Sequence, residues 1–133
     1  MRMLTAFNLS MPGVPCLYQG DEYADVGGND PDNRRMVRFD ALDADEADTR
    51  EHVAEWNRLR RSRMSLLYGQ TTIEALPTGL LRIERQYLDE TTTVYINPTP
   101  SPVTIEVMSE VVAGAVQDGE LPAYGCVAMA GAS

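Results

Sequence analysis

The sequence predicts a mixed fold, in which helices and one buried strand come first and a small antiparallel β-sandwich follows. Three observations support this prediction. A continuous apolar run at Val14–Tyr18 lies between turn signals, which is typical of a strand buried on both faces. Apolar side chains then recur at helical spacing around Trp56, and after Tyr68-Gly69 the pattern changes to the alternation of strands.

The first part of the chain is expected to span residues 1–66. Residues 1–10 are compatible with a helix, which Met11-Pro12-Gly13 ends, and the buried strand at Val14–Tyr18 follows. From Gln19 to about Ala47 there is no periodicity, and acidic residues are frequent. Loops of that length are uncommon in compact domains and often carry function, so this one is the first place to look for a site.

A longer helix is expected after this loop. Asp48 and Glu51 have the spacing of a capping box, and the helical pattern ends near Leu66. Trp56 lies on the apolar face and is expected to join the core rather than to form a ligand platform. His52 is the only histidine and has no Ser, Cys or second His arranged near it. We therefore expect His52 at the surface or at the edge of the core.

The second part, residues 67–133, is expected to form an all-β antiparallel domain, with the boundary near residues 67–70. The clearest strand is Val103–Val107, where apolar and polar residues alternate. The other strands are expected at Thr71–Leu76, Leu81–Tyr87, Thr92–Asn97, Val111–Val116 and Ala123–Met129. Several short strands at this spacing are typical of a small sandwich.

Composition excludes several classes of function. The chain has 133 residues and a formal net charge of −9, which argues against binding to nucleic acid or to anionic membranes. No apolar stretch approaches the ~20 residues of a transmembrane helix. Cys16 and Cys126 each lie in an apolar run, so we expect two buried thiols and neither a disulfide framework nor metal-ligand spacing. No cofactor motif is present, and the compartment is not indicated.

Three motifs follow one another along the chain. The first is Met-Pro-Gly-Val-Pro-Cys-Leu-Tyr-Gln-Gly-Asp-Glu at 11–22, the second is Gly-Asn-Asp-Pro-Asp-Asn-Arg-Arg at 28–35, and the third is Trp-Asn-Arg-Leu-Arg-Arg at 56–61, followed by Tyr68-Gly69. In this order they resemble the end of the catalytic barrel and the C-terminal β domain of the alpha-amylase family of glycoside hydrolases. The second motif resembles the neopullulanase, cyclomaltodextrinase and maltogenic-amylase branch.

This resemblance implies the last strand and last helix of a (β/α)8 barrel in residues 1–66 and the family's β domain in residues 67–133. It also implies a parent enzyme that hydrolyses or transfers alpha-glucosidic bonds by a retaining, two-carboxylate mechanism. In that family the nucleophilic Asp, the acid/base Glu and the third essential Asp lie on or after barrel strands four, five and seven. No residue here matches them, and those positions would precede Met1. We therefore expect no catalytic residue in this chain and no turnover by it alone.

The candidate substrate-binding residues are Asp30 and Arg34. Their spacing allows one side of a turn to present a carboxylate and a guanidinium together, and sugar hydroxyls need both an acceptor and donors. The resemblance implies that these two positions contact glucose units on the non-reducing side of the cleaved bond. The alternative is an internal salt bridge that holds the loop closed, and the sequence leaves both open.

Other polar residues are expected to be structural. Asp21 and Glu22 follow the predicted strand, where barrel enzymes collect catalytic groups, but adjacent carboxylates seldom face each other across a bond, so we expect them to brace the loop. Loop-bracing roles are also expected for Asp32 and Arg35. The acids at 43, 45 and 48 lack the glycine and distal glutamate of an EF-hand, so they are expected to be a solvated approach to the helix rather than a metal site.

Two further hypotheses stand beside the enzyme part. Tyrosines of the β domain could stack on sugar rings, which would make the chain a stand-alone glucan-binding module, although nothing in their spacing distinguishes them from core or cross-strand pairs, which is the favoured interpretation. These tyrosines are Tyr87, Tyr95 and Tyr124. A truncated product with only a scaffold role is the remaining hypothesis. The expected partner is an alpha-glucan or maltooligosaccharide through the parent enzyme, and a lone barrel strand with unpaired edges favours a homodimer.

Overall fold

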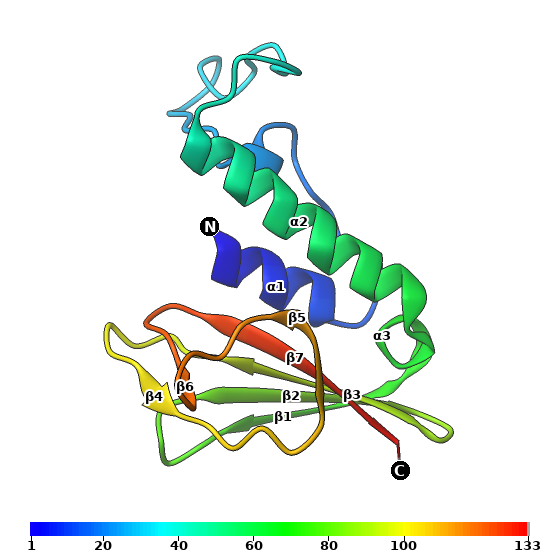
Figure 1. Cartoon of the computed structure of the whole chain (residues 1–133). Helices are drawn as coiled ribbons and strands as arrows, with labels where there is room; N and C mark the ends of the chain where they lie inside the picture. The colour runs from blue at the N-terminus through cyan, green and yellow to red at the C-terminus, as the bar shows by residue number, and fades with distance from the viewer. Residues whose placement is uncertain (133) are drawn as a thin grey trace.

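Two helices lie across one face of a five-stranded antiparallel sheet, and a small two-stranded sheet lies near its other face (Figure 1). The computed structural model describes residues 1–132. Its helices are α1 (Arg2–Ser10), η1 (Asp21–Tyr23, a 3₁₀ helix), α2 (Ala44–Ser62) and α3 (Met64–Tyr68). Its strands are β1 (Gln70–Ala75), β2 (Leu81–Tyr87), β3 (Glu90–Ile96), β4 (Val103–Thr104), β5 (Glu110–Gly114), β6 (Glu120–Leu121) and β7 (Cys126–Ala132). No helix among residues 1–132 has the length and apolarity needed to cross a membrane.

The strand pattern read from the sequence is largely confirmed. The large sheet has the order β1-β2-β3-β7-β5, and each neighbouring pair is antiparallel. The expected sandwich is only partly formed, because its second layer consists of β4 and β6 alone. The alternation at Val103–Val107 gives a strand of two residues, and the short β6 opposite it was not predicted. Helices α1 and α2 cover the opposite face of the large sheet (Figure 1).

The second helix begins five residues earlier than expected. Asp43 is its N-cap, and a capping box joins the Asp43 side chain to the Glu46 N–H and the Glu46 side chain to the Asp43 N–H. The sequence offers the same spacing at Asp48 and Glu51, but the earlier box adds a turn of helix. Asp48 instead forms an ion pair with Arg2 of α1.

The prediction of a buried strand at residues 14–18 is wrong. These residues have no regular structure, and the Val14 side chain is 97% exposed. A strand of a parallel sheet depends on hydrogen bonds to neighbouring strands, and among residues 1–132 no strand pairs with this segment. Cys16 is consequently exposed, which contradicts the expected buried thiol, whereas Cys126 is buried as expected. Burial raises the pKa of the Cys126 thiol to about 12.

One apolar core joins the helices to the sheet. Trp56 is 1% exposed at its centre, which confirms its predicted core position. The core's members are Ala6, Leu9, Trp56, Leu59, Leu66, Ile83, Val94, Ile96, Ala113, Cys126 and Ala128. A smaller cluster, containing Leu121 and Val127, fills the space between the sheet and β4–β6. Alternate residues of β7 therefore belong to different clusters, and residues on both sides of position 67 share the larger one.

Two buried arginines hold the end of α1 against the rest of the molecule. Arg60 of α2 donates to the carbonyl oxygens of Leu9, Met11 and Gly13 at 2.6–2.8 Å. Arg85 of β2 donates to the carbonyl of Ser10 at 2.6 Å and to that of Gly69 at 3.1 Å. The last carbonyls of a helix lack partners within the helix and carry a partial negative charge, so they suit a cation. Burial lowers the pKa of both guanidinium groups.

Candidate functional site

The loop between α1 and α2, residues 11–43, holds the site residues predicted from the sequence. Asp21 Oδ2 accepts a hydrogen bond from the Tyr18 N–H at 2.9 Å. Glu22 Oε2 accepts one from the Gly20 N–H at 2.8 Å. Both carboxylates therefore satisfy the backbone of the loop, which confirms that these residues brace it.

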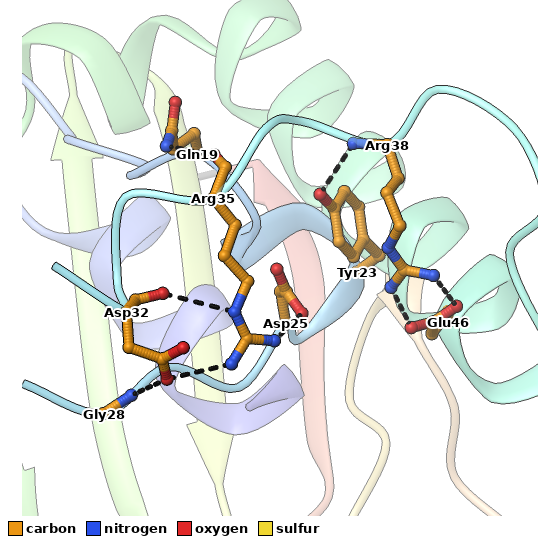
Figure 2. Close-up of polar contacts among 8 residues, drawn as sticks. All are labelled: Gln19, Tyr23, Asp25, Gly28, Asp32, Arg35, Arg38 and Glu46. Carbon is orange, nitrogen blue, oxygen red and sulfur yellow. Dashed lines mark hydrogen bonds and ion pairs between the residues drawn. The ribbon is translucent and has the colours of Figure 1, made fainter.

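Arg35 lies at the centre of the loop's polar contacts, as Figure 2 shows. Its guanidinium donates to Asp32 Oδ2 at 2.9 Å and to the Asp32 carbonyl at 3.2 Å, and lies 3.8 Å from Asp25 Oδ1. Asp32 Oδ2 also accepts from the Gly28 N–H at 2.9 Å, and Gln19 Nε2 donates to the Arg35 carbonyl at 2.8 Å. These contacts confirm the bracing role predicted for Asp32 and Arg35, because they fix the two sides of the loop to each other.

The same contacts shift the titration of both groups. The hydrogen bond from Arg35, followed by that from the Gly28 N–H, lowers the pKa of Asp32. The hydrogen bond to Asp32 raises the pKa of Arg35. The contacts therefore favour the charged form of both side chains.

A second cluster anchors the loop to the start of α2 (Figure 2). The Tyr23 ring is buried, and the Arg38 guanidinium lies 5.0 Å from the ring centroid. The Arg38 N–H donates to the Tyr23 hydroxyl oxygen at 3.1 Å, and the Arg38 side chain forms a two-pronged ion pair with Glu46. Because Glu46 also closes the capping box with Asp43, the loop and the helix N-terminus are fixed by one set of contacts.

Asp30 and Arg34 lie outside this bracing. Arg34 Nε is 2.6 Å from Asp30 Oδ1, so the ion pair that the sequence left as one alternative is formed. The Arg34 side chain is 70% exposed and the Asp30 side chain is 59% exposed. Exposed pairs of this kind contribute about 0–1 kcal/mol to stability, and their donors and acceptors stay accessible to a ligand. The pair is therefore available for binding while the rest of the loop is held by other residues.

A pocket of about 210 Å³ lies within the loop. Its wall includes Tyr18, Asp25, Asp32, Asn33 and Arg35, but neither member of the exposed ion pair. A polar lining of this kind offers hydrogen bonds to hydroxyl groups. Among residues 1–132 no group of three His, Cys, Asp or Glu side chains is placed to hold a metal ion.

Sequence reasoning missed Tyr23 and Arg38. Tyr23 follows two acids in a segment without periodicity, so nothing in the pattern marked it as buried. Arg38 is one of several arginines near many acids, and only the fold selects Glu46 as its partner. His52 lies at the edge of the core as expected, with its ring centroid 6.0 Å from that of Trp56. The expectation that no Cys lies near it was wrong, because Cys126 Sγ is 4.0 Å from its Nε2.

Replacing Arg35 with Met is expected to raise the pKa of Asp32, because the largest cause of its lowering is lost. Stabilisation from a carboxylate whose pKa is lowered in the folded state is present above the unfolded pKa, ~3.9, and disappears as the pH falls through the lower folded value. Carboxyl-carbon NMR of Asp32 between pH 2 and pH 6 measures the shift. Arg34→Met is the matched control, since Arg34 pairs with Asp30 instead. An unchanged Asp32 titration in Arg35→Met would contradict this account of the loop.

Comparison with known proteins supports a single family. No protein-family profile matches the chain. The cyclomaltodextrin glucanotransferase of Bacillus sp. (strain 38-2) is 31% identical over 102 residues, covering 74% of this chain and 14% of that protein. The crystal structure of maltogenic amylase from S. marinus superposes with a TM-score of 0.81 at 25% identity, covering 98% of this chain and 19% of that one. The alpha-amylase of Geobacillus thermoleovorans, solved with acarbose, gives a TM-score of 0.76 at 27% identity over 97% of this chain and 32% of that one.

The matched region is a small share of each relative, because the chain spans about one seventh of the glucanotransferase and about one fifth of the maltogenic amylase. The superpositions include the helices, the loop and the sheet, since they cover nearly the whole of this chain. In sequence and in fold, the chain is similar to one part of enzymes of the alpha-amylase family of glycoside hydrolases.

Proposed function

We propose that this chain is the C-terminal portion of an alpha-glucan-active, retaining glycoside hydrolase of the neopullulanase and cyclomaltodextrinase branch, and that it does not hydrolyse glucan alone. In this proposal residues 1–66 supply the end of the catalytic barrel with a substrate-side loop, and residues 67–133 supply the C-terminal β domain. The relatives named above act on or bind alpha-glucans or their analogues, which supports this substrate class.

The observation that carries the proposal is the exposed Asp30–Arg34 pair on a braced loop. A sugar hydroxyl can donate to the Asp30 carboxylate and accept from the Arg34 guanidinium, and both groups are held near each other before a ligand arrives. The contacts of Arg35 and Arg38 restrain the loop from both sides, so less conformational freedom is lost on binding. The pair would contact glucose units on the non-reducing side of the cleaved bond.

The proposed lack of turnover is supported by the hydrogen bonds that carboxylates of the loop already make. A retaining glycosidase needs two carboxyl groups ~5–5.5 Å apart with the scissile bond between them. In the loop, Asp21 and Glu22 accept from the backbone, and Asp32 is occupied by Arg35. These contacts give the three carboxylates a structural role within the loop, which supports a binding role for the loop rather than a catalytic one.

Titration of the ¹⁵N-labelled chain with maltoheptaose tests the binding role. We expect amide shifts in residues 28–36 and roughly tenfold weaker binding in Arg34→Met, which corresponds to the loss of about 1.4 kcal/mol. Arg58→Met is the matched control, because Arg58 forms a comparable exposed ion pair with Glu51 on α2. Equal affinities of the two variants for maltoheptaose, or no amide shift in residues 28–36, would contradict the proposed binding role.

An assay for released reducing sugar from maltoheptaose and β-cyclodextrin tests the lack of turnover. The purified chain is expected to release none above the buffer blank. Release that co-purifies with the chain and is abolished by an Asp or Glu substitution within it would overturn this part of the proposal.

Self-association remains a prediction, although not through a paired strand edge. Large apolar residues are exposed along the loop, namely Val14, Leu17, Tyr18, Val26, Met36 and Phe39. Sedimentation velocity over a range of concentrations decides whether this surface associates, and a monomer at all concentrations would exclude the homodimer.

A further inference from the structure

His52 joins three elements at the N-terminal end of α1, the helix that lies between α2 and the large sheet (Figure 1). His52 Nε2, on α2, lies 3.1 Å from the Arg2 carbonyl oxygen of α1. A carbonyl oxygen only accepts, so Nε2 carries the proton of the neutral ring and Nδ1 carries none. The ring packs beside Trp56, and Nε2 lies 4.0 Å from Cys126 Sγ of β7. One half-buried imidazole therefore connects α1, α2 and β7.

The two ends of α1 are held in different ways. The C-terminal end is fixed by the buried guanidinium groups of Arg60 and Arg85. The N-terminal end has no side-chain cap, and its first turn contains no acidic residue to offset the positive end of the helix. The ion pair between Arg2 and Asp48 is exposed and adds a weak contact there. A change at His52 therefore acts on the less firmly held end of α1.

The groups that face His52 disfavour a positive charge on its ring. From α1, the Arg2 guanidinium and the terminal ammonium group of Met1 repel an imidazolium. From α2, the Glu55 carboxylate attracts it. From β7, the Cys126 thiol offers no compensating charge, because burial raises its pKa to about 12. Burial of the ring is the largest effect and outweighs the attraction of Glu55 and the hydrogen bond to Arg2, so the pKa of His52 is lowered.

Protonation of His52 therefore costs folding free energy below neutral pH. The unfolded chain takes up this proton near pH ~6.5, and the folded chain does so only at lower pH. The stability that the neutral ring contributes is present above the unfolded pKa and is lost as the pH falls through the lower folded value. The added proton goes to Nδ1, so the donor to Arg2 remains while a positive charge appears beside the positive end of a helix.

Two hollows adjoin the first turn of α1. Pockets of about 490 and 510 Å³ share Arg2 and Tyr124 in their linings, and the larger one is also lined by His52 and Cys126. Cys126 is 6% exposed while the turn is in place. Movement of Arg2 away from His52 would join the two pockets and uncover the thiol.

We propose that His52 is a pH-sensitive switch for the first turn of α1, which holds this turn against α2 and β7 as a neutral imidazole and releases it as an imidazolium. The switch goes beyond the proposed function and uses no residue of the loop at 11–43. Because Arg60 and Arg85 keep the far end of α1 in place, the expected motion is a local opening rather than unfolding of the chain.

Hydrogen exchange and histidine NMR test the switch between pH 7 and pH 5. His52 is the only histidine of the chain, so its ring resonances are unambiguous, and they should titrate with a pKa below ~6.5. Amides of residues 5–8, which bond to carbonyls of the first turn, should exchange severalfold faster at pH 5 after correction for intrinsic rates, with little change in β2 and β3. In His52→Gln, which keeps an N–H donor but takes up no charge, the α1 amides should show no such dependence.

Thiol modification by 4,4′-dithiodipyridine gives a second measurement that needs no variant. Cys16 is exposed and serves as the internal reference, because the ratio of the two rates removes the reagent's own pH dependence. The rate at Cys126 relative to that at Cys16 should rise severalfold from pH 7 to pH 5. An unchanged ratio, an equal rise in His52→Gln, or a His52 pKa at or above ~6.5 would overturn the switch. Equal acceleration of exchange in α1 and in the sheet would also overturn it, since His52 would then support the fold as a whole.

Discussion

Truncating Trp56 to alanine is expected to lower the free energy of unfolding by about 3–5 kcal/mol, which is a large share of the ~5–15 kcal/mol of a typical domain. The ring is 1% exposed and lies in the core that joins α1, α2 and the sheet. Its removal leaves a cavity bordered by elements from both parts of the chain, so neither part can close it without moving the other. Urea unfolding monitored by far-UV circular dichroism measures the loss.

Trp56→Phe is the informative comparison. Within residues 1–132 the buried Trp56 Nε1 has no hydrogen-bond partner, so phenylalanine gives up no hydrogen bond and loses only part of the ring volume. We expect a cost of about 1–2 kcal/mol, well below that of alanine. A single unfolding transition should persist in both variants. Two separate transitions in either variant would contradict one core shared by the helices and the sheet.

The core and the strands could be read from the sequence because their signals are local. Alternation along β2 and β3 follows from fuller burial of one face, and helical spacing around Trp56 follows from one buried stripe. The start of α2 was misplaced because two capping-box spacings occur five residues apart. Either pair of residues could form a capping box, and the contact of Glu46 with Arg38 across the loop favours the earlier one.

Properties that depend on distant partners were not predictable. The apolar run at residues 14–18 has the composition of a buried strand, but composition does not say whether neighbouring strands are present. Arg85 stands on the inner face of β2 between Ile83 and Tyr87, where the alternation predicts an apolar residue. Its partners are the Ser10 and Gly69 carbonyls, and the first of these lies 75 residues away in sequence.

For the candidate site, the residues that brace the loop could be identified from the sequence because their partners are local. Asp21, Glu22, Asp32 and Arg35 have local partners, at most four residues away in most of their contacts. Tyr87 was considered a sugar platform from its residue type, and in the fold its ring centroid lies 6.0 Å from that of Tyr68.

Replacing Arg60 with Met is expected to destabilise the chain by about 3 kcal/mol. The guanidinium satisfies the carbonyls of Leu9, Met11 and Gly13, and a buried carbonyl left without a donor costs about 1–3 kcal/mol. Part of that cost is recovered because Met removes a buried cation whose pKa burial had already lowered. Chemical denaturation measures the loss, and Arg61→Met, at the exposed neighbouring position, should stay within about 0.5 kcal/mol of the wild type.

Arg60→Lys separates charge from geometry. An ammonium group keeps the charge at the end of α1 but does not reproduce the planar fork that reaches three carbonyls, so we expect an intermediate loss. Hydrogen exchange should accelerate at residues 9–18 in both variants more than in the sheet, because Arg60 fixes the segment that leads into the loop. If instead the sheet opens first, Arg60 supports the fold as a whole, and the loop that carries Asp30 and Arg34 is positioned by its own contacts alone.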